Sequence, residues 1–116
     1  MHKYKELKVW QKSMNVTAEI YKITEELPAK EKFNLISQIC RAAVSIPSNI
    51  AEGAGRHTKK DFSHFLSIAL GSSFELETQV ILTEKLNYLT KAQIDQILTQ
   101  ITEIQSMILG LKKSLE

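Results

Sequence analysis

Hydrophobic residues recur at intervals of three and four positions along most of the chain, which is the period of an amphipathic α-helix. No stretch shows the strict alternation of apolar and polar residues that is typical of a half-buried β-strand. Short segments containing Pro, Gly or polar residues interrupt the pattern at three places. The pattern therefore predicts four helices, at about residues 4–26, 30–54, 59–88 and 91–114.

Residues that start and stop helices stand at the predicted boundaries. Pro28 ends the first helix, because proline cannot continue one, and Gly53 and Gly55 suit the end of the second. Thr58 is a suitable N-cap for the third helix. Thr90 and Gln93 have the spacing of a capping box, in which each side chain bonds the other's backbone N–H, so they predict the start of the fourth helix.

Pro47 lies inside the second predicted helix. Proline has no backbone N–H, so the carbonyl of Ala43 loses its usual helical hydrogen bond. We expect the second helix to bend at this point.

Short connections force successive helices to run in opposite directions, because a helix that ends beside its successor leaves no room for a crossover. The predicted fold is all-α, an antiparallel up-down-up-down four-helix bundle. The 116 residues are predicted to form one domain, residues 1–116, which is long enough for a substantial core.

The second helix carries a column of polar residues beside its apolar stripe. Spacings of four, four, three and four place Arg41, Ser45, Asn49, Glu52 and Arg56 on one face. A polar face next to a core stripe is typical of a buried network or a contact between subunits. A nucleic-acid contact and a catalytic row are the two alternatives.

Two carboxylates in the third helix are candidate partners for this column. An ion pair of Arg41 with Glu75 or with Glu77 would fix the register of the helices without adding much stability. The residues predicted to specify helix or subunit packing are Arg41, Ser45, Asn49, Glu52, Glu75 and Glu77.

Charge is unevenly distributed, although the net charge is only +2. Residues 1–60 hold eleven Lys and Arg against six Glu, whereas residues 61–116 hold four Lys against seven acidic residues. The predicted topology brings the chain start, the second-to-third connection and the chain end to one end of the bundle. Basic residues gathered there are candidates for binding the phosphates of RNA or DNA: Lys3, Lys5, Lys8, Lys12, Arg56, Lys59, Lys60, Lys112 and Lys113.

Motifs of known catalytic and metal sites are missing from the sequence. There is no phosphate-binding loop, nucleophile elbow, zinc-protease motif or paired cysteine motif. Asp61 and His64 have the spacing of one half of a di-iron site, but no second half accompanies them. The single Cys40 excludes an intramolecular disulfide and is predicted to be a buried small hydrophobe. We predict no cofactor, no metal and no enzymatic activity.

A hydrolase or nuclease is the alternative of another class, with Glu52, Glu75 and His64 as its candidate residues. The first residues lack the apolar run of a signal peptide, and nowhere do 18 uninterrupted apolar residues occur. We therefore expect a cytoplasmic protein without a membrane partner.

Four segments resemble one protein family over nearly the whole chain. They are L-K-V-W-Q-K at 7–12, P-A-K-E-K-F-N-L at 28–35, Q-I-C-R-A-A-V-S-I-P-S-N-I-A-E-G-A-G-R at 38–56 and F-L-S-I-A-L-G-S-S-F-E-L-E-T-Q at 65–79. The family is that of the "four helix bundle proteins", encoded within intervening sequences of bacterial 23S rRNA genes. The string from Ser45 to Arg56 is its most specific part.

The resemblance implies a homopentamer, in which the bundles form a barrel with a central channel. It also implies kinship with accessory variability determinant proteins of diversity-generating retroelements, whose basic barrels bind nucleic acid and a reverse transcriptase. The net charge of +2 departs from those strongly basic relatives, which makes a retroelement role the less favoured interpretation. The alternative function is a scaffold for protein partners, or an accessory subunit of a nucleic-acid enzyme that does not itself bind nucleic acid.

Overall fold

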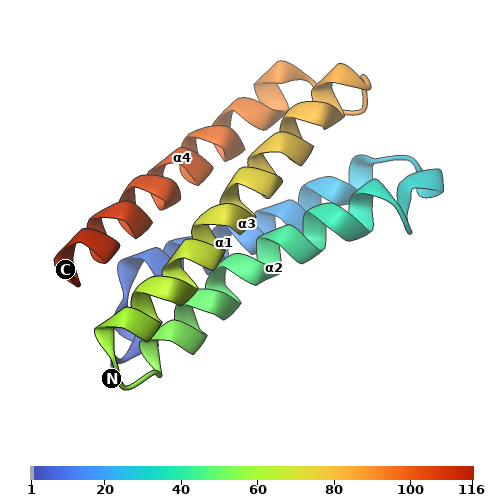
Figure 1. Ribbon diagram of the computed structural model, residues 1–116. Helices are drawn as coiled ribbons and strands as arrows, with labels where there is room; N and C mark the ends of the chain where they lie inside the picture. Colours follow the sequence, from blue (N-terminus) through green and yellow to red (C-terminus); the bar gives the residue numbers. More distant parts are fainter. Residues whose placement is uncertain (1) are drawn as a thin grey trace.

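The computed structural model describes residues 2–116, which form four α-helices (Figure 1). This confirms the all-α four-helix bundle. Three short 3₁₀ turns accompany the helices, at Tyr4–Glu6, Thr24–Glu26 and Ala29–Glu31. The helices are α1 (Lys8–Ile23), α2 (Leu35–Ala54), α3 (Lys59–Lys85) and α4 (Lys91–Ser114).

Successive helices run antiparallel, and the chain crosses the length of the molecule four times (Figure 1). The bundle measures 44 × 24 × 20 Å. Each helix packs against the next, and α1 also packs against α4, so the four helices form a closed square. The contact between α2 and α3 is the most extensive of these. The square has four outer surfaces, one between each pair of neighbouring helices.

Capping residues confirm the predicted starts of α3 and α4. The N–H of Asp61 donates to Thr58 Oγ1 at 3.1 Å. In the capping box, the N–H of Gln93 donates to Thr90 Oγ1 at 3.2 Å, and Thr90 N–H donates to Gln93 Oε1 at 2.8 Å. Each bond satisfies a backbone donor that the first turn of a helix leaves free.

Other helix ends differ from the prediction. The first helix begins four residues late because Leu7, in an extended conformation, separates the turn at Tyr4–Glu6 from α1. The second begins at Leu35, because Asn34 has φ −116° and ψ −102°, outside the helical region. The third ends at Lys85, since Asn87 adopts φ 62°, a left-handed conformation that asparagine tolerates and that stops a helix.

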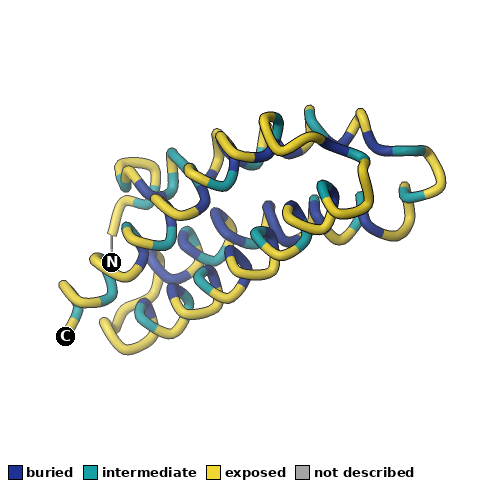
Figure 2. Tube along the Cα trace, turned by 90° about the horizontal axis from the view of Figure 1, so that it is seen from above, coloured by how far each residue is buried: buried dark blue, intermediate teal, exposed yellow. Residues whose placement is uncertain are grey.

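The core is built mainly from the apolar stripes, and Figure 2 shows buried positions recurring along the helices. In α4 the whole isoleucine stripe is buried: Ile94, Ile97, Ile101, Ile104 and Ile108. These residues repeat at three and four positions, so one face of α4 remains against the bundle along its length. The regular stripe, together with the capping box at Thr90 and Gln93, explains why both ends of this helix were predicted correctly.

The α2 helix continues through Pro47, which is buried. The carbonyl that proline leaves unpaired finds a donor on α1: Thr17 Oγ1 lies 3.1 Å from the carbonyl oxygen of Ala43. The same hydroxyl lies 2.7 Å from the carbonyl oxygen of Ser13, so one hydrogen serves both acceptors. A hydrogen bond between helices thus replaces the one that Pro47 removes within α2. The predicted bend stays a prediction.

Gly53 allows α2 and α3 to approach closely, and it does not stop the helix as its position suggested. A Cβ atom placed on Gly53 would lie 2.7 Å from Cβ of Phe65 and 3.0 Å from a ring carbon of Phe62. Helix α2 includes Gly53 and ends at Ala54, where Gly55 follows as the C-cap. A side chain at residue 53 would therefore push α2 and α3 apart.

Gly53→Ala is expected to lower the free energy of unfolding by about 1–3 kcal/mol, because overpacking forces backbone shifts. Urea unfolding followed by circular dichroism measures this. The control is Gly110→Ala, since nothing lies within 4 Å of a Cβ atom there. That control should stabilise the protein by roughly 0.5–1 kcal/mol, the difference in helix propensity. Equal effects of the two substitutions would contradict the packing role of Gly53.

Thr17→Val keeps the shape of the side chain and removes the donor to Ala43. The free energy of unfolding should fall by about 1–3 kcal/mol, the cost of leaving a buried carbonyl unsatisfied. The same substitution at the exposed Thr102, whose hydroxyl bonds only within its own helix, is the matched control and should change stability little. If the two variants unfold at the same urea concentration, the bond to Ala43 does not stabilise α2.

Candidate nucleic-acid interface and subunit contact surfaces

One end of the bundle collects the start of the chain, the connection from α2 to α3 and the end of α4 (Figure 1). The N–H of His2 donates to the carbonyl of Ala54 at 2.8 Å, which ties the start of the chain to the end of α2. Lys112 near the end of α4 contacts Ser67 of α3 through its ammonium group. The nine basic residues predicted from topology to lie at one end are on these segments. We call this end the basic end.

Two of the nine basic side chains are neutralised by carboxylates. Lys12 Nζ lies 2.6 Å from an oxygen of Glu103, and Arg56 pairs with Glu52 at 3.3 Å. The guanidinium of Arg56 also lies 4.8 Å from the ring centre of Phe65, a cation–π contact. Within residues 2–116, six exposed lysines of the basic end form no ion pair: Lys3, Lys5, Lys8, Lys59, Lys60 and Lys113.

The middle of the polar column forms a hydrogen-bonded network between α2 and α3. The hydroxyls of Ser45 and Ser72 are 2.7 Å apart. Asn49 Nδ2 donates to the carbonyl of Ser45 at 2.8 Å and to its hydroxyl at 2.9 Å. The prediction that Ser45 and Asn49 serve helix packing agrees with these contacts.

A polar groove of about 270 Å³ runs beside this network between α2 and α3. Arg41 and Glu75 line it, both exposed, but no ion pair joins them in the described chain. The amide oxygen of Gln79, also in the groove, is buried and has no hydrogen-bond partner there. The groove therefore holds a cation, an anion and an acceptor that have no partner among residues 2–116.

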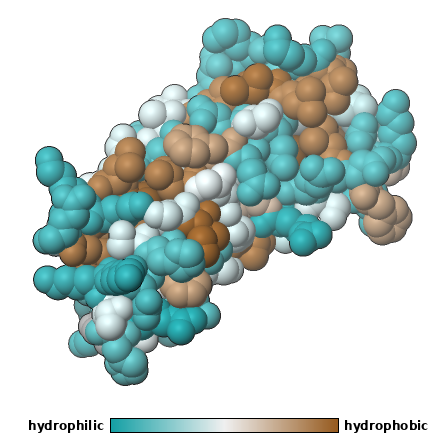
Figure 3. Space-filling view, in the orientation of Figure 1, coloured by the Kyte–Doolittle hydropathy of each residue, from teal (hydrophilic) through white to brown (hydrophobic). Residues whose placement is uncertain are grey.

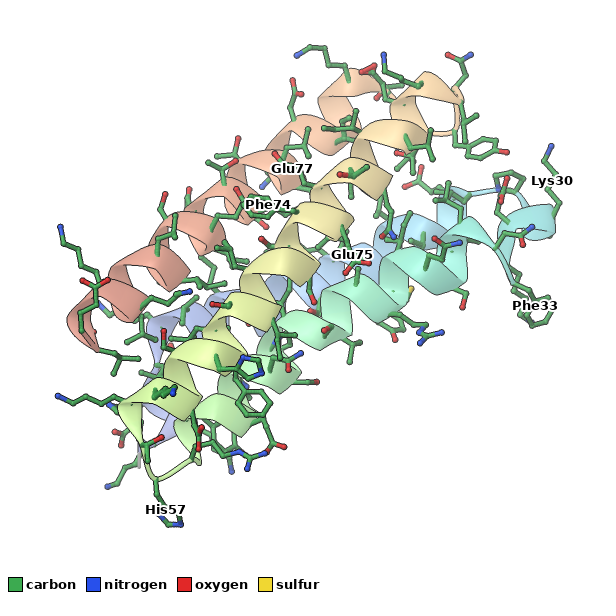
Figure 4. All side chains as sticks on the ribbon, in the orientation of Figure 1. Lys30, Phe33, His57, Phe74, Glu75 and Glu77 are labelled. Carbon is green, nitrogen blue, oxygen red and sulfur yellow. The ribbon has the colours of Figure 1, made fainter. Side chains whose placement is uncertain are left out.

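The predicted pairing of Arg41 with Glu77 is wrong. Glu77 accepts a hydrogen bond of 3.1 Å from Gln105 Nε2 of α4, so its carboxylate faces away from α2. Figure 4 shows Glu75 and Glu77 on different sides of α3. Two residues along a helix correspond to a turn of about 200°, so neighbouring carboxylates of this spacing face nearly opposite ways. Glu77 serves packing between α3 and α4.

Two solvent-facing apolar surfaces were not predicted from the sequence. The first is a groove between α1 and α2, whose lining includes Trp10, Met14, Tyr21 and Val44. The first three extend the apolar stripe of α1 on one side. In the structure, however, Met14 is 45%, Tyr21 51% and Val44 39% exposed. We call this surface the α1–α2 groove.

The second surface is the outward side of α3, seen face-on in Figure 3, where brown hydrophobic residues lie among teal polar ones. Ile68, Leu82 and Leu86 are between 39% and 44% exposed. Phe74, on the α4 side of the helix, is 49% exposed. Phe74 and Leu86 continue the apolar pattern of α3 just as the buried Leu76 does, so apolar spacing alone does not identify the buried face of α3.

The length and composition of α3 would allow it to cross a membrane. One 18-residue window has a mean hydropathy of 1.2, and 33% of that window is buried in the bundle. The exposed carboxylate of Glu75 lies in the middle of its outward side, where a lipid environment would make a charge costly.

Side chains considered for chemistry do not gather into a site. Within residues 2–116, no three His, Cys, Asp or Glu residues are placed to hold a metal ion. His64 is exposed, with its ring 5.5 Å from that of Phe65. Cys40 was predicted to be buried but is half-buried, and its sulfur lies 3.8 Å from the hydroxyl of Thr24.

Comparison with known proteins places these features in a wider group. A sequence model of the 23S rRNA-intervening sequence protein matches residues 5–110. A crystal structure of a protein of unknown function, from the S23 ribosomal protein family of Bacteroides thetaiotaomicron VPI-5482, is similar with a TM-score of 0.81 and 30% sequence identity. That similarity covers 90% of this chain and 98% of the other. No curated protein matches.

Proposed function

Because the chain belongs to the 23S rRNA-intervening sequence protein family, we propose that it is a cytoplasmic, non-enzymatic protein that assembles into a ring. The ring has five copies, and its basic end contacts RNA or DNA. Oligomerisation uses the polar column of α2 and the outward side of α3.

The observation that carries the nucleic-acid contact is a group of six exposed lysines at one end, which form no ion pair within residues 2–116, in a chain with a net charge of only +2. In a ring whose axis follows the bundles, the basic ends of all copies lie on one side. Their potentials add around the axis, which strengthens attraction to phosphates.

Unpaired groups on α2 and α3 support the ring. Arg41, Glu75 and the buried oxygen of Gln79 have no partner within the described part of one copy. Beside them α3 exposes several large apolar residues. Apolar residues on more than one side of a helix are typical of a helix that packs against other surfaces on more than one side.

The positions of the three residues considered for hydrolysis support the non-enzymatic proposal. Glu52 lies in an ion pair with Arg56. Glu75 and His64 are eleven residues apart on α3, which separates their backbones by roughly 16 Å along the helix. They are therefore too far apart to act on one bond.

Binding to an rRNA fragment should weaken steeply as salt rises, because lysine contacts release counterions from the phosphates. Lys59→Glu with Lys60→Glu should lower the affinity at least tenfold at low salt, measured by gel retardation. The matched control is Lys30→Glu with Lys32→Glu, which changes the charge equally near Phe33, at the end opposite His57 (Figure 4). Equal losses in both variants, or retardation insensitive to salt, would contradict a contact through the basic end.

Light scattering should give a mass near five times that of the 13.2 kDa chain. The measurement should be repeated over a range of protein concentrations, because a weak ring dissociates on dilution. A monomer mass at every concentration would refute the ring.

Phe33 favours the second candidate function, a scaffold for protein partners. It is 86% exposed, and it projects with Lys30 from the connection between α1 and α2 (Figure 4). The ammonium of Lys32 lies 5.4 Å from its ring centre. Exposed aromatic residues often anchor protein contacts.

If the protein is a scaffold, a pull-down should recover a protein partner even after nuclease treatment. Phe33→Ala should abolish that recovery and leave RNA retardation unchanged.

A further inference from the structure

We propose that the α1–α2 groove of one copy receives the outward side of α3 from the next copy, so that α2 lines the axis of the ring. This inference rests on the proposed ring and adds which surfaces meet. It also assigns a partner to the unpaired charges of α2 and α3.

The α1–α2 groove has the shape and chemistry to receive a helix. Near the basic end it has a volume of about 360 Å³ and is lined by residues that include Trp10, Met14, Val44 and Pro47. Val44 also lines its continuation toward Tyr21, where the volume is about 470 Å³. A long apolar groove between two helices suits the apolar face of a third helix.

The outward side of α3 presents a matching ridge. Ile68, Glu75 and Leu82 follow one another at intervals of seven residues, which keeps them on one line facing a neighbouring helix. Gly71 lies among them, exposed, and nothing in the copy lies within 4 Å of a Cβ atom placed there. Glycine costs stability inside a helix, and its small size permits another backbone to come close.

The groove and the ridge lie at corresponding heights along the bundle. Hydrogen bonds set this register, since Thr17 of α1 meets Ala43 of α2 and Ser45 of α2 meets Ser72 of α3. Their common level is therefore close to the middle of both surfaces. In a ring whose axis follows the bundles, surfaces at equal heights meet directly.

Charge complementarity identifies the second copy as the occupant. Arg41 lines the α1–α2 groove as well as the polar groove beside α3. Within one copy, Arg41 and Glu75 lie at the same level along the bundle, because both line one groove. In a ring whose axis follows the bundles, Glu75 of the next copy therefore also lies at the level of Arg41 when its ridge enters the α1–α2 groove. Each charge then gains the partner that a single copy does not supply. Arginine binds carboxylates through two parallel hydrogen bonds, which favours one register.

The angle between the two surfaces fits a closed ring. In a ring of five copies, the two contact surfaces of each copy are turned toward each other by slightly more than a right angle. The α1–α2 groove and the ridge beside α2 occupy neighbouring sides of the four-helix square, which are about a right angle apart. Helix α2, shared by both sides, then faces the axis with exposed polar residues such as Ser48 and Glu52.

A third apolar patch gives the experiment a matched alternative. Phe74 and Leu109, 49% and 53% exposed, lie on α3 and α4. The surface between those helices is opposite the α1–α2 groove. Contacts between opposite surfaces produce an open filament, because the rotation between copies does not close.

Cysteine cross-linking tests which surfaces meet. In a Cys40→Ser background, Met14→Cys with Ile68→Cys should oxidise to a ladder of covalent oligomers, up to the size of the ring, on a non-reducing gel. The control pair, Met14→Cys with Leu109→Cys, should remain monomeric on the same gel. Cross-linking of the control pair in preference to the Ile68 pair would overturn the proposal.

A charge exchange provides a second test that does not depend on cysteines. Arg41→Glu and Glu75→Arg should each weaken assembly at least tenfold, measured as the concentration at which the ring dissociates. The double variant should restore assembly, because the pair is re-formed with opposite polarity. Independent, additive losses in the double variant would contradict the Arg41–Glu75 contact.

Failure of this inference can be distinguished from failure of the ring. A ring-sized mass by light scattering, without cross-links between Met14→Cys and Ile68→Cys, overturns the pairing of surfaces and leaves the ring standing. A monomer mass without cross-links overturns both.

Discussion

The close contact between α2 and α3 is the constraint on which most other features depend. It requires a residue without a side chain at Gly53, where a Cβ atom would meet Cβ of Phe65 at 2.7 Å. Further along, the same contact brings the hydroxyls of Ser45 and Ser72 to 2.7 Å. It also forms the groove in which Arg41 and Glu75 lie. The connection between these two helices lies at the basic end (Figure 1). A wider spacing of these two helices would separate all of these groups.

Helix α2 is fixed on its other side by a different means. Pro47 removes a hydrogen bond inside the helix, and Thr17 of α1 supplies a donor to the carbonyl of Ala43 in its place. The residue that weakens α2 internally thus creates an acceptor that α1 can use. Proline and glycine are both unfavourable inside helices when considered alone. Here Gly53 and Pro47 place the central helix against its two neighbours.

The accuracy with which a helix was predicted from the sequence depended on whether its apolar residues follow one stripe or lie on several sides. In α4 the isoleucines form one regular buried stripe, and the bounds of this helix were predicted correctly. Helix α3 is apolar on several sides, and spacing could not separate Phe62, which is buried, from Phe74, which is exposed. Conformation at single residues, such as Asn87 with φ 62°, also has no periodic signal. The basic end was predicted because it follows from topology, whereas the partners of individual charges depend on side-chain direction.

The hydrogen bond from Thr17 to Ala43 and the absence of a side chain at Gly53 have a consequence for how this protein can diverge. Two sides of α2 are therefore held in close contact with neighbouring helices, at Ala43 and at Gly53. Its solvent-facing row, from Arg41 through Ser48 to Glu52, carries no such requirement. Substitutions in that row can therefore change the surface that α2 presents to solvent without disturbing the packing of the bundle. One helix thus keeps its packing on two sides and leaves a third side free to vary.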